Sequence, residues 1–89
     1  MANINLSWNA PTTGGSVVEY KIYRKAGTHA AAADITGASD AGFPVTQAVA
    51  SGTTYVDSSA TLGDTYSYTV SASNAAGEGT AASPATATA

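Results

Sequence analysis

The sequence contains no cysteine and carries few charges of either sign. Disulfide bridges, thiolate metal sites and cysteine nucleophiles are therefore excluded. Three basic residues against six acidic ones leave a net charge of -3, so no basic surface can displace counterions from nucleic acid or attach to an anionic membrane. No apolar run approaches the roughly 20 residues of a membrane-spanning helix. We expect neither nucleic acid nor a membrane among the partners.

The motifs of common enzyme classes are also missing. The sequence holds one histidine, and it has no phosphate loop, dinucleotide fingerprint or serine elbow. Ser39, His29 and Asp40 can be combined into a triad on paper, but an adjacent Ser and Asp in a flexible loop would not hold catalytic geometry. The acidic residues do not form the closely spaced series of a calcium loop. We predict no enzyme activity, no catalytic residue, no cofactor and no metal site.

Apolar residues alternate with small polar ones along most of the chain, a period typical of half-buried β-strands. Ile4, Leu6 and Trp8, for example, share one face of a strand, and asparagine and serine occupy the other. The length of 89 residues fits a single domain over residues 1–89. Strands are predicted over residues 3–9, 17–26, 43–50, 53–59, 65–74 and 80–89. Six short strands with turn residues between them indicate an all-β sandwich of two sheets.

The segment 27–42 interrupts this pattern, because it is long and made mostly of small residues. Its "HAAAAD" stretch has the composition of one helical turn, but an isolated helix of that length is marginal in water. We therefore predict a long surface loop between two strands.

Three stretches resemble the fibronectin type III domain, above all its bacterial and phage versions: "LSW-APT", "EYKIYR" and "TTYVDSSATLGDTYSYTVSASNAAGEG". The resemblance covers nearly the whole chain and implies an immunoglobulin-like β-sandwich of fibronectin type III topology. It makes Trp8 the core tryptophan and Tyr66 the residue of the tyrosine corner, with its hydroxyl bonded to backbone near the bend. Alternation and resemblance together predict a core of Leu6, Trp8, Tyr20, Ile22, Tyr55, Leu62, Tyr66, Tyr68 and Val70.

The chain departs from this family at its first strand. The family has a strand A before the tryptophan strand, whereas here strand A is expected to be missing or truncated. The strand over residues 3–9 would then be an unpaired sheet edge, and exposed edges invite pairing with another chain. One hypothesis is that a neighbouring subunit or a rearranged terminus covers this edge. The alternative is a short frayed edge that its own asparagines protect.

The three cations, Lys21, Arg24 and Lys25, lie within five residues of one predicted strand, with Tyr23 between them. An exposed tyrosine beside lysine suits a protein interface or a platform for sugar stacking. The alternative is a solvated strand face whose charges discourage aggregation. The candidate interaction surface consists of Asn3, Asn5, Lys21, Tyr23 and Lys25.

The sequence thus favours a non-catalytic structural or interaction module. The preferred hypothesis is a small phage virion protein, a capsid decoration or tail protein on the virion surface. It docks to capsid or tail subunits through its sheet edge or through the Lys21 and Tyr23 face of the strand over residues 17–26, which is strand C of the family. Self-association is a further option. The alternative is an extracellular accessory or spacer module of a secreted bacterial enzyme or adhesin, joined to flanking domains. A carbohydrate-binding module that uses Tyr23 and Lys21 is a weaker third. The start "MANINLSW" has no export signal, so we expect either a domain excised from a longer protein or a product assembled in a cytoplasm.

Overall fold

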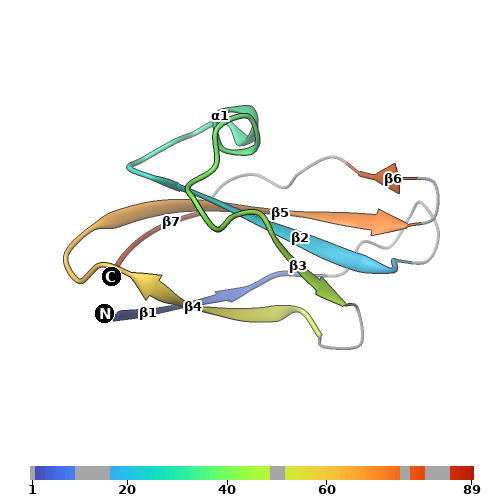
Figure 1. The fold of residues 1–89 in the computed structure, drawn as a ribbon, viewed down its shortest axis with the longest axis horizontal. Helices are drawn as coiled ribbons and strands as arrows, with labels where there is room; N and C mark the ends of the chain where they lie inside the picture. Colours follow the sequence, from blue (N-terminus) through green and yellow to red (C-terminus); the bar gives the residue numbers. More distant parts are fainter. Residues whose placement is uncertain (1, 10–16, 49–51, 75–76, 80–84) are drawn as a thin grey trace.

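A computed structural model describes residues 2–9, 17–48, 52–74, 77–79 and 85–89 of the protein. Its strands form two antiparallel sheets that pack face to face (Figure 1), which confirms the predicted all-β sandwich. The elements in chain order are β1 (Ala2–Ser7), β2 (Glu19–Ala26), α1 (Ala32–Thr36), β3 (Val45–Ala48), β4 (Thr54–Ala60), β5 (Thr65–Asn74), β6 (Gly77–Glu78) and β7 (Ala85–Thr88).

The two sheets differ in width. The smaller sheet consists of β1 paired with β4, and the larger one has the order β3, β2, β5 and then β6. Both β6 and β7 pair with β5, at its two ends, so they share the fourth strand position of the larger sheet. The strand predicted over residues 80–89 corresponds to β7 at Ala85–Thr88. Residues 80–84 lie outside the described part of the chain.

The core lies between the two sheets. Fully or largely buried side chains at its centre are Ile4, Ile22, Ala60, Tyr66 and Tyr68. The half-buried apolar side chains that pack around them include Leu6, Trp8, Tyr55 and Val70, and the Trp8 ring meets the buried Tyr20 ring edge on, with centroids 5.2 Å apart. The residues predicted for the core lie in it or pack against it, with one exception.

The exception is Leu62, whose side chain is 76% exposed. Leu62 lies on the turn between β4 and β5, where the Asp64 amide donates to the Thr61 carbonyl at 3.0 Å. The side chain of Ala60, at the end of β4, is fully buried and fills the inward position instead. The prediction that Leu62 lies in the core is therefore wrong.

Tyr66 makes the bond that the resemblance implied. The backbone amide of Thr61 donates a hydrogen bond to its hydroxyl at 2.9 Å. The ring is buried in the core, so this bond ties the β4–β5 turn to the centre of the sandwich.

The segment 27–42 is not simply a surface loop, because it contains α1. The helix lies over the outer face of the larger sheet (Figure 1) and contacts β2 and β5. Its anchor is Ile35, which is fully buried. Serine and threonine occupy the outer face of β5, and these small side chains allow the helix to approach closely. Ser67 fastens the segment by donating to the Gly27 carbonyl at 2.7 Å and accepting from the His29 amide at 2.9 Å.

The two ends of the described chain lie at the same end of the sandwich (Figure 1). Ala2 is paired with Ala60 at the end of β4. Ala89 bonds to the adjoining turn, since its amide donates to the Asp64 carbonyl at 2.9 Å and its carbonyl accepts from the Gly63 amide at 2.8 Å.

Candidate functional site

The predicted interaction surface is split between the two outer faces of the sandwich. Asn3 and Asn5 are exposed and alternate with the buried Ile4, so they face outward from the smaller sheet. Lys21 and Lys25 alternate with inward residues of β2 and face outward from the larger sheet. These two sets therefore do not form one surface.

Tyr23 is buried, contrary to the expectation of an exposed ring; its exposed fraction is 8%. Its hydroxyl donates to the Glu78 carboxylate at 2.6 Å. Ser71 also donates to this carboxylate, and the Lys21 ammonium lies 3.8 Å from it. A polar cluster, defined by Lys21, Tyr23, Ser71 and Glu78, thus lies on the outer face of β2, and the buried Tyr23 ring offers no open aromatic platform.

The pKa shifts in this cluster agree with its contacts. Burial, followed by the hydrogen bond to Glu78, raises the pKa of Tyr23 to about 12. The hydrogen bonds from Ser71 and Tyr23 lower the pKa of the Glu78 carboxyl. Lys25, the remaining member of the predicted surface on β2, is half-buried, and its ammonium lies 3.4 Å from the Asp34 carbonyl.

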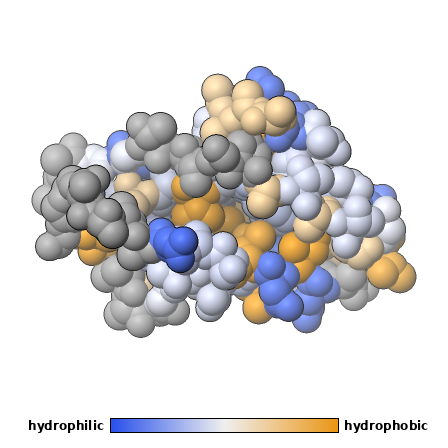
Figure 2. Space-filling model, turned by 180° about the vertical axis from the view of Figure 1, so that it is seen from behind, coloured by the Kyte–Doolittle hydropathy of each residue, from blue (hydrophilic) through white to orange (hydrophobic). Residues whose placement is uncertain are grey.

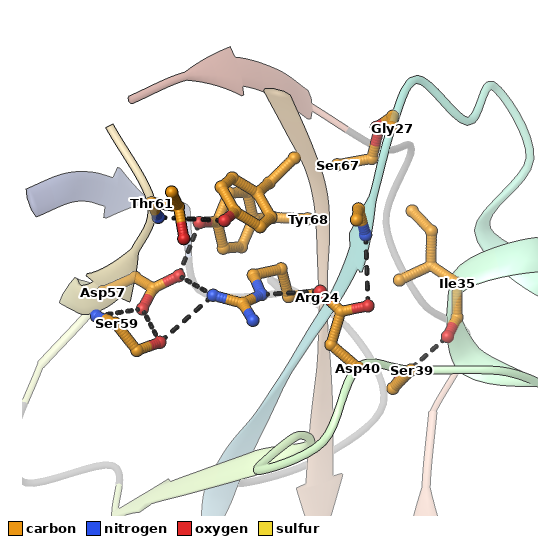
Figure 3. Close-up of polar contacts among 12 residues, drawn as sticks. Arg24, Gly27, Ile35, Ser39, Asp40, Asp57, Ser59, Thr61, Ser67 and Tyr68 are labelled. Carbon is orange, nitrogen blue, oxygen red and sulfur yellow. Dashed lines mark hydrogen bonds and ion pairs between the residues drawn. The ribbon is translucent and has the colours of Figure 1, made fainter. Parts of the chain in front are cut away.

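A second cluster lies inside the sandwich and was missed at the level of sequence (Figure 3). Arg24 follows Ile22 by two residues and so shares its inward face, and its exposed fraction is 9%. Its Nη1 donates to Asp57 and Ser59, each at 3.1 Å, and its Nε donates to Asp40 at 2.9 Å. This position contradicts the grouping of Arg24 with the cations of an exposed strand face. Its parity with Ile22 was the signal for the inward position.

Aromatic rings complete the environment of the Arg24 guanidinium. Its central carbon lies 4.6 Å from the centroid of the Phe43 ring and 4.5 Å from that of the Tyr66 ring. Cation–π contacts of this kind gain strength when the cation is desolvated. Arg24 therefore joins β2 to β4 through Asp57 and to the segment 27–42 through Asp40.

Asp57 is the acceptor at the centre of this cluster and is 1% exposed. It accepts from Arg24, from the Tyr68 hydroxyl at 2.6 Å, and from the amide and hydroxyl of Ser59 at 3.0 and 2.7 Å. Burial alone would raise the pKa of this carboxyl, but the hydrogen bonds from Tyr68, Ser59 and Arg24 outweigh it and lower the pKa. Burial and the bond to Asp57 raise the pKa of Tyr68.

Other contacts occupy the three residues that can be combined into a triad on paper. The residues of the paper triad bond elsewhere: Ser39 donates to the Ile35 carbonyl at 2.7 Å, the His29 ring lies 2.9 Å from the Ala26 carbonyl, and Asp40 accepts from Arg24. In the described ranges, no group of three potential ligand side chains is placed to hold a metal ion, and no helix there has the length and apolar character to cross a membrane.

The free edge of β1 is the remaining candidate site. The Trp8 amide donates to the Thr53 carbonyl at 3.0 Å, so the backbone groups of Leu6, which has the same parity, also point toward β4. In an antiparallel pair the intervening residues point the opposite way. The N–H and C=O groups of Asn5 and Ser7 therefore face away from β4, and no described strand pairs with β1 on that side.

The outer edge of β4 is treated differently. The side chain of Gln47 on β3 donates to the carbonyls of Gly52 and Thr54 at 2.8 and 2.9 Å. This contact also places β4 on the β3 side of the larger sheet. The free edge of β1 consequently lies on the side of β6 and β7.

Because β4 lies on the β3 side, and the larger sheet has four strand positions against two in the smaller one, we infer that the larger sheet projects beyond β1 on the other side. We call this region the β1 flank and define it by the edge of β1 at Asn5 and Ser7 together with the half-buried side chains Leu6, Val70 and Ala87. Viewed from behind Figure 1, the molecule shows apolar surface lying between polar regions (Figure 2).

Comparison with known proteins adds no relative: no protein-family model matches the chain, and no curated protein matches it significantly. The class that the structure defines is an all-β sandwich of two antiparallel sheets. Its likeness to fibronectin type III domains rests on the motifs of the sequence, with the Tyr66 hydroxyl bond as a structural counterpart.

Proposed function

We propose that the protein is a non-catalytic structural module that docks to a protein partner through the β1 flank. The observation that carries this proposal is the edge of β1, where the backbone groups of Asn5 and Ser7 have no described partner strand. Free strand edges are templates for pairing with other chains, and strand addition is a recurring mode of protein recognition.

The internal clusters support a role as a rigid scaffold. Arg24, Asp40 and Asp57 use their charges on one another, and these ion pairs connect both sheets with the segment 27–42. Polar groups that are fully paired inside a fold rigidify it without offering a reactive site.

The outer face of β2 is a weaker docking candidate. Glu78 engages both Lys21 and Tyr23, so a partner would have to compete with existing contacts. The same burial of Tyr23 argues against carbohydrate binding, which needs an accessible ring.

We favour the surface of a phage virion as the setting, with capsid or tail subunits as partners. The support is the resemblance to phage fibronectin-like domains and the free edge. An extracellular accessory or spacer module of a secreted bacterial enzyme or adhesin is the alternative. Co-sedimentation with purified virions separates the two, because a decoration protein pellets with the particle and a spacer module does not.

A proline substitution tests the docking edge itself. Ser7→Pro removes an amide that points away from β4, so the fold should tolerate it, as edge positions tolerate proline. Leu6→Pro is the matched control, since it removes an amide that points toward β4 and should unfold the sheet. We expect Ser7→Pro to stay folded by circular dichroism and to lose virion binding. Unchanged binding by this variant would contradict docking through the edge.

A further inference from the structure

We infer that the β1 flank accepts one extended strand from a partner polypeptide, with large aliphatic side chains at alternate positions, and that it excludes a second folded sandwich. This inference rests on the proposed docking function and specifies the partner's chemistry. Three observations carry it: the widths of the two sheets, the sizes of the side chains below the free edge, and the direction of the backbone groups of β1.

The widths exclude pairing of two copies through β1. Neighbouring strands lie about 4.8 Å apart. In a β1-to-β1 dimer the two β1 strands would lie this distance apart. The β6 and β7 strands of both copies would then have to share the narrow space opposite the two β1 strands, in the layer of the larger sheets. Because β6 and β7 are inferred to project beyond β1 from the strand order and the Gln47 contacts, the two larger sheets would collide. A single strand has no second sheet and fits below the projection.

The side chains below the projection are small. Ala85 and Ala87 on β7 are paired with the inward-facing Tyr68 and Tyr66, so they face the inner side as well; Ala85 is exposed and Ala87 is half-buried. Packed sheets lie about 10 Å apart, and alanine fills only a small part of that distance. An added strand must therefore supply large side chains on its inward face.

The inward face of the added strand should also be uncharged. The described inward side chains that border the flank, Leu6, Val70 and the two alanines of β7, are all apolar. A charged group placed among them would be desolvated without a partner. The backbone of the strand would bond to the N–H and C=O groups of Asn5 and Ser7, while its outward side chains, beside Asn5, can be polar.

The experiment adds such a strand to the chain. A seven-residue segment that alternates threonine and isoleucine is fused before Ala2 through an Asn-Gly turn, so that it folds back along β1. Two linker lengths that differ by one residue are used, because a one-residue slip exchanges the two faces of a strand. The control is the same extension with each isoleucine replaced by aspartate. Amide hydrogen exchange of Asn5 and Ser7 is measured by NMR.

With the isoleucine extension in one linker length, we expect exchange at Asn5 and Ser7 to slow by on the order of a hundredfold, as for amides that become part of a stable sheet. The aspartate control should leave both rates unchanged. The isoleucine segment as a separate peptide, at roughly millimolar concentration, should protect the same amides more weakly, since tethering supplies the effective concentration.

The failures can be told apart. If both isoleucine extensions leave Asn5 and Ser7 fast while β5 stays protected, the single-strand inference is wrong, and docking by a folded partner surface survives. If the tethered extension protects the amides of Asn5 and Ser7 but the separate isoleucine peptide does not, the strand does not come from a separate polypeptide. If the unextended monomer already protects both amides, the edge is covered and the docking function fails too. Protection that appears only in a dimer of the unextended chain would make a second copy the occupant.

Discussion

Asp57→Ala should cause one of the largest losses of stability that a single substitution can produce in this chain. It removes the acceptor of four hydrogen bonds, leaves the Tyr68 hydroxyl without this acceptor, and leaves Nη1 of Arg24 with the Ser59 hydroxyl but no carboxylate. Breaking a buried ion pair by removing one partner costs about 3–5 kcal/mol. Small domains have a total free energy of unfolding of about 5–15 kcal/mol, so this single change should remove a large part of it.

Urea unfolding at neutral pH measures the effect, with the fluorescence of Trp8, the single tryptophan, as the signal. Asp40→Ala is the matched control, because Asp40 binds the same guanidinium with a side chain that is 22% exposed. We expect it to cost about 1–2 kcal/mol, and it keeps the test readable if Asp57→Ala does not fold.

A double variant separates the ion pair from packing. Arg24→Met together with Asp57→Leu replaces the pair by apolar side chains, which buried sites often tolerate. Its loss should therefore be smaller than the sum of the losses for Arg24→Met and Asp57→Leu measured singly. If Asp57→Ala costs less than about 1 kcal/mol, as exposed ion pairs do, the cluster does not hold the sheets together as described.

Four further predictions address other contacts. Folding lowers the pKa of Asp57. The stability that its carboxylate contributes is therefore present above the unfolded pKa near 3.8 and is lost as the pH falls through the lower folded pKa. In Asp57→Asn, the urea concentration at the unfolding midpoint should depend less on pH in this acidic range. Tyr66→Phe should lower the free energy of unfolding in urea by about 1–2 kcal/mol, because the Thr61 amide loses its acceptor. An unchanged free energy of unfolding would show that this hydrogen bond does not stabilise the β4–β5 turn. Ile35→Ala should cost about 2–4 kcal/mol and speed amide exchange in α1, whereas an unaffected helix would mean that Ile35 is not its anchor. Ultraviolet titration should find a pKa of about 12 for Tyr23, and Glu78→Gln should move the pKa of Tyr23 toward 10.0 because it removes the charge of the Glu78 acceptor.

Alternation of apolar and polar residues carried most of the information about the fold. It placed the strands and most of the core, because one face of each strand is buried and the side-chain period is 2. The hydrogen bond of the Tyr66 hydroxyl was expected from the resemblance alone. Leu62 was misplaced because a turn residue has no strand parity, and spacing within a motif does not say which way a turn side chain points.

The inward positions of Arg24 and Asp57 follow from the alternation of side chains along β2 and β4, although both residues are charged. Both residues lie at inward positions, next to Ile22 and Tyr55 respectively. Charged residues are rarely buried unless paired, and the sequence interpretation grouped Arg24 with Lys21 and Lys25 because the three lie within five residues of one strand. The partner on β4 depends on how the two sheets face each other, which local pattern does not specify.

The segment 27–42 and Tyr23 were misjudged for a related reason. A five-residue helix is marginal alone. Here the buried side chain of Ile35 anchors it against the larger sheet, where α1 contacts β2 and β5. Tyr23 faces outward as predicted, yet Glu78 from the far end of the chain covers it. Contacts of this kind arise only when distant segments meet, so no local signal announces them.

Residue-by-residue amide exchange along β1 in the isolated chain tests the central claim most directly. Leu6 and Trp8 point toward β4 and should be protected, whereas Asn5 and Ser7 point to the free edge and should exchange at nearly the rate of an unstructured peptide. This alternation is the result that the account predicts. Equal protection of all four amides in a monomer would show that the edge of β1 is already paired and would contradict docking through it.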